Sequence, residues 1–254
     1  MGIAPTSSLD RPLITVVTAV FNGCKTLEAT IQSVLNQTYE SIEYLVIDGG
    51  STDGTLDIIR KYEHAIDYWL SEPDRGVYHA MNKGITASTG SWLNFLNSND
   101  VFADSSIIDS IAIRYLHGDA KFIYSDVLLR NGGGHPPRRY VCDHTKLIIN
   151  HQASIYHKSL HDEHGLYLVA PRLTISDYFF FSLVNQLDYL KADQPIAIYD
   201  TTGISQSRRS VEQKLIVDYL LNNLPKYTFL IYFSLYYQYR SIKEYFGRFW
   251  TKPQ

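Results

Sequence analysis

The sequence lacks features that would each have indicated a particular class of protein. It has only 2 cysteines in 254 residues, Cys24 and Cys142, so neither a disulfide framework nor a cysteine-based metal site is expected. No run of about 18 apolar residues occurs, so no segment is expected to span a bilayer. A secretory signal has a basic stretch followed by an apolar core, and the first residues contain neither in that order. A reduced, cytoplasmic location is the simplest expectation.

An excess of positive charge is also missing. The chain has 23 Lys and Arg against 26 Asp and Glu, a net charge of -3, so no global field favours nucleic acid as a partner. With 45% hydrophobic residues, the chain is long enough to bury one large core, or one core with an appended subdomain.

Apolar runs and helical patterns alternate over the first hundred residues. Buried strands are expected at 13–20, 44–47, 66–70 and 92–96, and helices at 26–36, 55–62 and 76–88. This alternation predicts an α/β fold of βαβ units with a mostly parallel sheet covered by helices. After residue 100 the pattern weakens: helices are expected at 105–116, 177–184 and 211–221, strands at 121–125 and 151–156, and a loop at 131–139.

Polar clusters follow the ends of the expected strands. They are 18–22, 48–53, 74–75 and 97–100. Ligands of parallel sheets bind at the carboxyl ends of the strands, so we expect all four clusters at one edge. Within them, Asp53 or Thr52 is suited to cap the following helix, which would leave Asp48 free to contact a base or a ribose.

The cluster Asn97 to Asp100 ends a hydrophobic strand in short oxygen-bearing side chains. Such a strand tip can hold a hard divalent cation, Mn²⁺ or Mg²⁺, which often shares its oxygen ligands with phosphates. A helix cap or an Asx turn is the alternative for Asn99 and Asp100.

The turn before the third helix combines two acids and a guanidinium, Glu72, Asp74 and Arg75. Arg75 is suited to bidentate contact with phosphate, and Asp74 to contact with a ribose or a sugar. A local ion pair at the helix start is the alternative. Asn82 and Lys83 lie about two turns further along and are expected to face the same cleft.

These motifs, in this order, resemble glycosyltransferase family 2, the inverting sugar transferases of GT-A fold, and in particular its bacterial O-antigen, capsule and colanic-acid-type branch. The resemblance covers residues 13 to about 104. The matching stretches are TVVTAVFN from Thr15, SVLNQTY from Ser33, VIDGGSTDGT from Val46, SEPDRG from Ser71, AMNKG from Ala80 and LNSND from Leu96.

The resemblance implies roles for individual residues. The nucleotide-sugar donor, a UDP-sugar, would be held by Thr18, Val20, Asn22, Asp48, Asp74, Arg75, Asn82, Lys83, Asn99, His151 and Gln152. Asp100 corresponds to the metal-binding aspartate of the family's Asp-x-Asp-type motif. Asp177 lies in Ser176-Asp177-Tyr178, which resembles the family's Ala-Asp-Tyr segment, and would be the catalytic base.

Three positions depart from the family pattern. The family usually reads Asn-Ala-Asp-Asp where this chain has Asn97-Ser98-Asn99-Asp100, so Asn99 removes one negative charge beside the cation. His79 and Phe179 stand where acidic residues are common. The first departure bears on metal affinity, and the other two bear on acceptor recognition.

Two assignments in the second half of the chain have plain structural alternatives. Asp177 precedes an apolar run, so it is suited either to take the proton of an acceptor hydroxyl or to cap a helix. His151 is equally suited to hold the diphosphate or the metal and to form an ordinary hydrogen bond from a strand.

The sequence predicts a GT-A domain over 1–205 and a helical tail over 206–254. Within the domain, 11–104 would bind the nucleotide sugar and 105–205 the acceptor. Aromatic and basic residues are mixed in 226–250, which suits peripheral contact with the inner face of the membrane. Packing of this segment on the core or on a second subunit of a homo-oligomer is the alternative.

The predicted activity is inverting transfer of a sugar from a UDP-sugar to a lipid-linked or growing bacterial surface glycan. A non-catalytic nucleotide-sugar or glycan-binding protein is one rival, made conceivable by Asn99. A sugar nucleotidyltransferase is the other, but the residues from Phe21 to Lys25 match its Gly-rich basic loop poorly.

Overall fold

The computed structural model describes residues 11–130, 136–201, 208–221 and 230. The chain forms two compact units, Met1–Gly203 and Ile204–Gln254. The second unit contains helix α7 (Arg208–Leu220). Apart from Leu230, the tail segment 226–250 lies outside the described residues, so its expected membrane contact stays a prediction.

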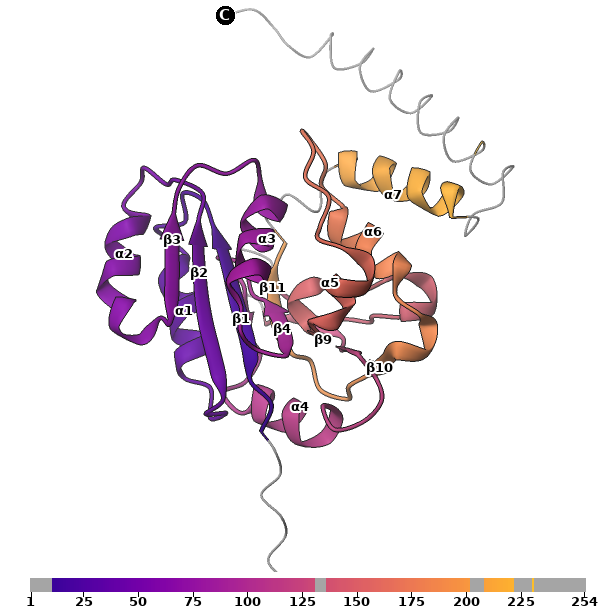
Figure 1. Ribbon diagram of the computed structural model, residues 1–254, viewed down its shortest axis with the longest axis horizontal. Coiled ribbons are helices and arrows are strands. Elements are labelled where there is room, and N and C mark those ends of the chain that lie inside the picture. Colours follow the sequence, from indigo (N-terminus) through magenta and orange to yellow (C-terminus); the bar gives the residue numbers. More distant parts are fainter. Residues whose placement is uncertain (1–10, 131–135, 202–207, 222–229, 231–254) are drawn as a thin grey trace, which may run out of the picture. The chain divides into compact units, whose positions relative to one another are not determined.

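A seven-stranded sheet forms the centre of the first unit (Figure 1), in the order β10-β6-β9-β4-β1-β2-β3. β9 runs antiparallel to both of its neighbours, and the other adjacent pairs are parallel. The strands are β1 (Ile14–Val20), β2 (Ile42–Asp48), β3 (Tyr68–Ser71), β4 (Trp92–Phe95), β6 (Phe122–Tyr124), β9 (Ser154–His157) and β10 (Tyr189–Lys191). The mostly parallel sheet expected from the sequence is confirmed.

A smaller sheet of four short strands lies in the second half of the unit, in the order β5-β11-β7-β8. Its strands are β5 (Val101–Phe102), β7 (Val127–Arg130), β8 (Arg138–Tyr140) and β11 (Ala197–Asp200). None of these strands was expected from the sequence. The predicted loop 131–139 is wrong at its end, where Arg138 and Arg139 belong to β8.

Helices flank the central sheet (Figure 1). They are α1 (Leu27–Leu35), α2 (Thr55–Tyr62), α3 (Val77–Ala87), α4 (Ile107–Tyr115), α5 (Ser159–His164) and α6 (Ser176–Leu183), with 3-10 turns η1 (Glu63–Ala65), η2 (His144–Lys146), η3 (His151–Ala153) and η4 (Gln186–Asp188). The strand expected at 151–156 begins three residues later, because His151, Gln152 and Ala153 form η3.

Burial explains why these segments take these forms. Every residue of β1 is buried, and its β-branched side chains are favoured on a pleated surface packed on both faces. The second half of the core is aromatic: the Phe122 ring stacks on Tyr156 at 5.2 Å and meets Phe181 edge-on at 5.0 Å. Close helix packing on β1 requires Gly84, where a Cβ atom would lie 2.4 Å from the side chain of Val17.

Candidate functional site

The carboxyl end of β2 is closed by the side chain of Asp48, which is completely buried. Its Oδ2 accepts hydrogen bonds from the backbone N–H groups of Gly50 (3.1 Å) and Ser51 (3.0 Å) and from the Ser71 hydroxyl (2.6 Å), while Oδ1 accepts from the Ser51 hydroxyl. The expectation of a free carboxylate is therefore wrong: Asp48 shapes the glycine turn and ties β3 to β2. A ligand contact through this turn stays a prediction.

Asn22 links the end of β1 to the same turn. Its backbone N–H donates to the Ser51 hydroxyl at 2.7 Å, and its Oδ1 accepts from the N–H of Thr52 at 3.0 Å. The residue has φ 51°, a left-handed conformation that asparagine tolerates better than most residues. The structure thus brings Asn22 together with the turn that follows Asp48.

Two residues of β1 that were predicted to bind the nucleotide sugar are enclosed by the sheet. Thr18 is completely buried, and its hydroxyl donates to the carbonyl of Leu96 at 2.8 Å and lies 3.1 Å from the Tyr44 hydroxyl. Val20 is 5% exposed. Both side chains pack inside the sheet, and neither is exposed at the carboxyl ends of the strands.

Asp74 occupies the space beside Gly49. A Cβ atom at Gly49 would lie 2.5 Å from Asp74 Oδ2, so the missing side chain at position 49 gives the Asp74 carboxylate room at the end of β2. The other oxygen, Oδ1, accepts from the N–H of Gly76 at 2.7 Å. Arg75 is exposed, and its guanidinium forms no hydrogen bond or ion pair with any residue in the described ranges.

Asn82 and Lys83 of α3 already have protein partners. Asn82 pairs with the backbone of Tyr167 in both directions, donating from Nδ2 to the carbonyl (2.8 Å) and accepting at Oδ1 from the N–H (3.0 Å). Lys83 Nζ lies 2.9 Å from Glu72 Oε1. These contacts anchor α3 to the loop at 167 and to the turn at 72. A direct contact of either residue with the nucleotide sugar stays a prediction.

Asp100 lies at the tip that follows β4 and is only 4% exposed. Its Oδ2 accepts from Gln152 Nε2 at 2.8 Å, and its Oδ1 accepts from the backbone N–H of Asp200 at 3.0 Å. Burial raises the pKa of Asp100 to about 6, and these two hydrogen bonds offset the rise only in part. The side chain does not cap a helix, since α4 begins seven residues later at Ile107.

Asn99 is held in an unusual backbone conformation next to this carboxylate. Its φ is 91°, its N–H donates to the Thr30 hydroxyl at 3.1 Å, and its carbonyl accepts from Arg130 Nη2 at 2.7 Å. Arg130 Nε also lies 3.5 Å from Asp200 Oδ2. Two strands of the small sheet, β7 and β11, thus fix the strand tip, a role that the sequence did not indicate.

A second hydrogen-bonded set surrounds Asp177, which lies in the first turn of α6. Its Oδ2 lies 2.8 Å from His151 Nδ1, and its Oδ1 accepts from the Tyr78 hydroxyl at 2.6 Å. The other ring nitrogen of His151, Nε2, lies 3.0 Å from Asn97 Nδ2. Asp177 does not cap α6, whose N-cap is Ile175. His151 and Gln152 are neighbours in η3, so the sets around Asp177 and Asp100 adjoin.

The oxygen atoms beside Asp100 suit a hard cation. Gln152 Oε1 and Asn97 Oδ1 are buried without a hydrogen-bond partner, and the Asp100 carboxylate is desolvated, a state that a cation would relieve. Within the described part of the chain no three His, Cys, Asp or Glu side chains are grouped to hold a metal ion. A single carboxylate is nevertheless enough for Mg²⁺ that is also bound by substrate phosphates.

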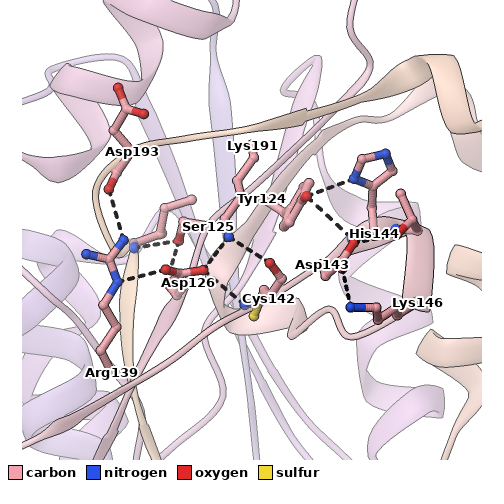
Figure 2. Close-up of polar contacts among 12 residues, drawn as sticks. Tyr124, Ser125, Asp126, Arg139, Cys142, Asp143, His144, Lys146, Lys191 and Asp193 are labelled. Atoms are coloured by element: carbon pink, nitrogen blue, oxygen red, sulfur yellow. Dashed lines mark hydrogen bonds and ion pairs between the residues drawn. The ribbon is translucent and has the colours of Figure 1, made fainter.

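A buried acid outside these sets, Asp126, links β8 of the small sheet to β10 of the central sheet (Figure 2). Asp126 Oδ2 pairs with Arg139 Nε at 2.7 Å, and its Oδ1 pairs with Lys191 Nζ at 2.6 Å and accepts from the N–H of Cys142 at 2.9 Å. Burial would raise the pKa of Asp126, but these partners outweigh it and lower the pKa. No sequence pattern pointed to Asp126, because its partners lie 13 to 65 positions away and on other elements.

No helix in the described ranges is long and apolar enough to cross a membrane.

The comparisons with known proteins agree with this geometry. The family described as Glycosyl transferase family 2 matches residues 15–165. An uncharacterized glycosyltransferase of Mycobacterium tuberculosis is 31% identical over 208 residues, covering 78% of this chain and 78% of the relative. A PGL/p-HBAD biosynthesis glycosyltransferase of the same organism is 31% identical over 178 residues, covering 66% of this chain and 68% of the relative.

Solved structures share the fold. S. aureus TarS 1-349 in complex with UDP-GlcNAc superimposes with a TM-score of 0.66 at 17% identity, covering 82% of this chain. The mannosyltransferase PcManGT of Pyrobaculum calidifontis, in complex with GDP-Man and Mn²⁺, gives a TM-score of 0.64 at 14% identity, covering 86% of this chain. The chain spans 65% of the TarS chain and 66% of the PcManGT chain. The fold is therefore GT-A, and the chain belongs to glycosyltransferase family 2.

Proposed function

We propose that this protein transfers a sugar, with inversion, from a UDP-sugar to a lipid-linked or growing bacterial surface glycan. The observation that carries the proposal is the pair of adjoining sets around Asp100 and Asp177, next to the strand ends that carry Asp48 and Asp74. The choice of UDP is supported by the similarity to TarS, which has been solved with UDP-GlcNAc. The choice of acceptor is supported by relatives named for PGL/p-HBAD and teichuronic acid biosynthesis.

The nucleotide would lie over the carboxyl ends of β1 and β2. The turn that Asp48 and Asn22 shape would present backbone groups there, and the half-buried Asp74 carboxylate beside Gly49 would accept hydrogen bonds from a base or a ribose. The exposed guanidinium of Arg75 is suited to bidentate pairing with the diphosphate.

Asp100 would hold a divalent cation, Mn²⁺ or Mg²⁺. When bound, the cation neutralises negative charge on the diphosphate as it leaves. Asn99 adds no charge, but its backbone, held by Arg130 and Thr30, fixes the direction of the neighbouring carboxylate. The cation would therefore depend on Asp100 as its single charged protein ligand.

Asp177 would act as the general base. Its carboxylate takes the proton of the acceptor hydroxyl while the hydroxyl oxygen bonds to the anomeric carbon. The bond from that carbon to the diphosphate oxygen breaks at the same time, and the diphosphate keeps the electron pair. Asp177 belongs to the predicted acceptor half, 105–205, which is consistent with a nucleotide half at 11–104.

The test measures UDP release from UDP-N-acetylglucosamine and UDP-glucose, with and without Mn²⁺, alongside binding of UDP by thermal shift. We expect Asp100→Ala to lower turnover roughly 100-fold or more and to abolish the response to Mn²⁺. Asp177→Asn should lose turnover and keep UDP binding. Near-normal turnover in Asp100→Ala would remove the metal from the scheme. A wild-type protein that binds UDP and releases none from either donor would support the binding-only rival.

A further inference from the structure

A tyrosine outside the polar clusters of the sequence reaches the proposed base. Tyr78 lies in the first turn of α3, and its hydroxyl donates to Asp177 Oδ1 at 2.6 Å across 99 positions of the sequence. We propose that Tyr78, together with His151, orients the Asp177 carboxylate for proton removal. The inference rests on the proposed function, in which Asp177 is the base.

Two donors from two different elements hold the two carboxylate oxygens. Tyr78 of α3 reaches Oδ1, and His151 of η3 reaches Oδ2 at 2.8 Å. One hydrogen bond would let the carboxylate rotate about the contact, whereas two bonds on different oxygens also fix its plane. A carboxylate has about four acceptor sites, so two donors do not by themselves exhaust its capacity to take a proton.

Asn97 determines which way the histidine donates. The Nδ2 group of Asn97, 3.0 Å from His151 Nε2, can only donate, so Nε2 must carry the lone pair. The proton of the neutral ring is then on Nδ1 and points to Asp177, because one ring nitrogen fixes the role of the other. This assignment follows from the hydrogen-bond network as a whole.

Tyr78 is suited to be a permanent donor. Its side chain is 7% exposed and its ring packs 5.7 Å from that of Tyr167. Burial, and then the charge of Asp177, raise the pKa of Tyr78 well above its ordinary value, so the hydroxyl stays protonated at neutral pH. The same charge adds to the burial that raises the pKa of Tyr156 and of Tyr167. Among the described residues, the titratable groups that interact with Asp177 include His151 and these three tyrosines.

The proton balance gives Tyr78 a positioning role. In the transfer step the proton of the acceptor hydroxyl, or of water during donor hydrolysis, passes to Asp177, and Tyr78 keeps its own proton throughout. Without the Tyr78 hydroxyl, the carboxylate would lose the hydrogen bond to Oδ1 and part of the stabilisation of its charge. Proton removal would slow, while the nucleotide turn at 48–53 would not change.

The test is Tyr78→Phe, which removes only the hydroxyl. Hydrolysis of UDP-N-acetylglucosamine and UDP-glucose with Mn²⁺ should show a kcat lowered roughly 10- to 100-fold, as expected for loss of a hydrogen bond to a charged group, with KM and UDP binding unchanged. Tyr62→Phe is the matched control, because the hydroxyl of Tyr62, at the end of α2, donates to a different carboxylate, Glu28 Oε1 of α1, at 2.7 Å. That variant should keep the wild-type kcat.

Two further readouts separate positioning from general damage to the fold. In the pH profile of kcat, the acidic limb should move to higher pH in Tyr78→Phe, because a carboxylate that loses a hydrogen-bond donor has a higher pKa. The double variant Tyr78→Phe with Asp177→Asn should be no slower than Asp177→Asn alone. A kcat and acidic limb equal to wild type, or an equal loss in Tyr62→Phe, would overturn the inference.

A measurement without turnover keeps the inference separate from the proposed function. In protein carrying ¹³C-labelled aspartate, the Asp177 carboxyl signal is assigned as the one missing from Asp177→Asn, and it is titrated in wild type and in Tyr78→Phe. If neither UDP-sugar is hydrolysed, the proposed function fails, and this titration still tests whether Tyr78 donates to Asp177. A raised Asp177 pKa in Tyr78→Phe supports the contact, and an unchanged pKa refutes it.

Discussion

Acidification should destabilise the fold through one buried histidine, His161 of α5. Its side chain is 7% exposed, and its ring stacks on Phe180 at a centroid distance of 4.4 Å. Its Nδ1 lies 2.9 Å from the carbonyl of Gly165 and its Nε2 lies 2.9 Å from the Tyr156 hydroxyl. A carbonyl can only accept, so Nδ1 carries a proton. Burial lowers the pKa of the ring to about 4, so at pH 7 the ring is neutral and Nε2 accepts from the Tyr156 hydroxyl.

The sign and size of the effect follow from linkage. The unfolded chain binds a proton at a pKa of about 6.5, whereas the folded chain binds it only near 4. The contribution of His161 to stability is therefore complete above about pH 6.5 and is lost as the pH falls towards 4. Between pH 7 and pH 5 the loss is about 2 kcal/mol, counting about 1.36 kcal/mol per pH unit below 6.5.

A pH profile of the wild type alone would not isolate this group. Burial raises the pKa of Asp100 to about 6, so the folded state binds a proton there more tightly than the unfolded state does. That carboxyl stabilises the fold as the pH falls through the same window, opposite in sign to His161. The informative quantity is the difference in unfolding free energy between the wild type and His161→Gln, in which the Asp100 contribution cancels.

Urea unfolding followed by tryptophan fluorescence at pH 7 and pH 5 measures this difference. His161→Gln should cost about 2 kcal/mol more at pH 7 than at pH 5, because the wild type has lost that much stability at the lower pH. His64→Gln, at an exposed position in η1, should differ from wild type equally at both values. A cost of His161→Gln that is the same at both pH values would refute a buried neutral imidazole.

Two further substitutions test the site rim and the small sheet. Gly49→Ala should displace the Asp74 carboxylate, which lies 2.5 Å from the added Cβ, and should reduce the thermal shift given by UDP. Gly118→Ala, with no atom within 4 Å, should leave that shift unchanged, and an equal UDP response in both variants would contradict the role of Asp74. Asp126→Asn should lower the free energy of unfolding by about 1–2 kcal/mol, since its two cationic partners are partly exposed, and thermal unfolding at low and high salt would measure it. An unchanged melting temperature at low salt would show that those ion pairs do not stabilise the fold.

The sequence predicted the part of the fold that has long, regular signals. Continuous apolar runs marked β1, β2 and β4, because these strands are buried on both faces. Apolar residues at helical spacing marked α1, α2 and α3, because these helices are buried on one face. The parallel arrangement then placed the ends of those strands at one edge. The four strands of the small sheet and the turn η3 left no such period, and their existence depends on partners far away in the chain.

For the site, the sequence by itself predicted that the segments carrying Asp48, Asp74 and Asp100 follow neighbouring parallel strands, and β4, β1, β2 and β3 are indeed parallel neighbours. Only the tertiary structure decided what each side chain does there. It enclosed Asp48 in its own turn, and it brought Tyr78 to Asp177 across 99 positions. The physical reason is that hydrogen-bond partners depend on the packing of distant elements, which neither composition nor local spacing encodes.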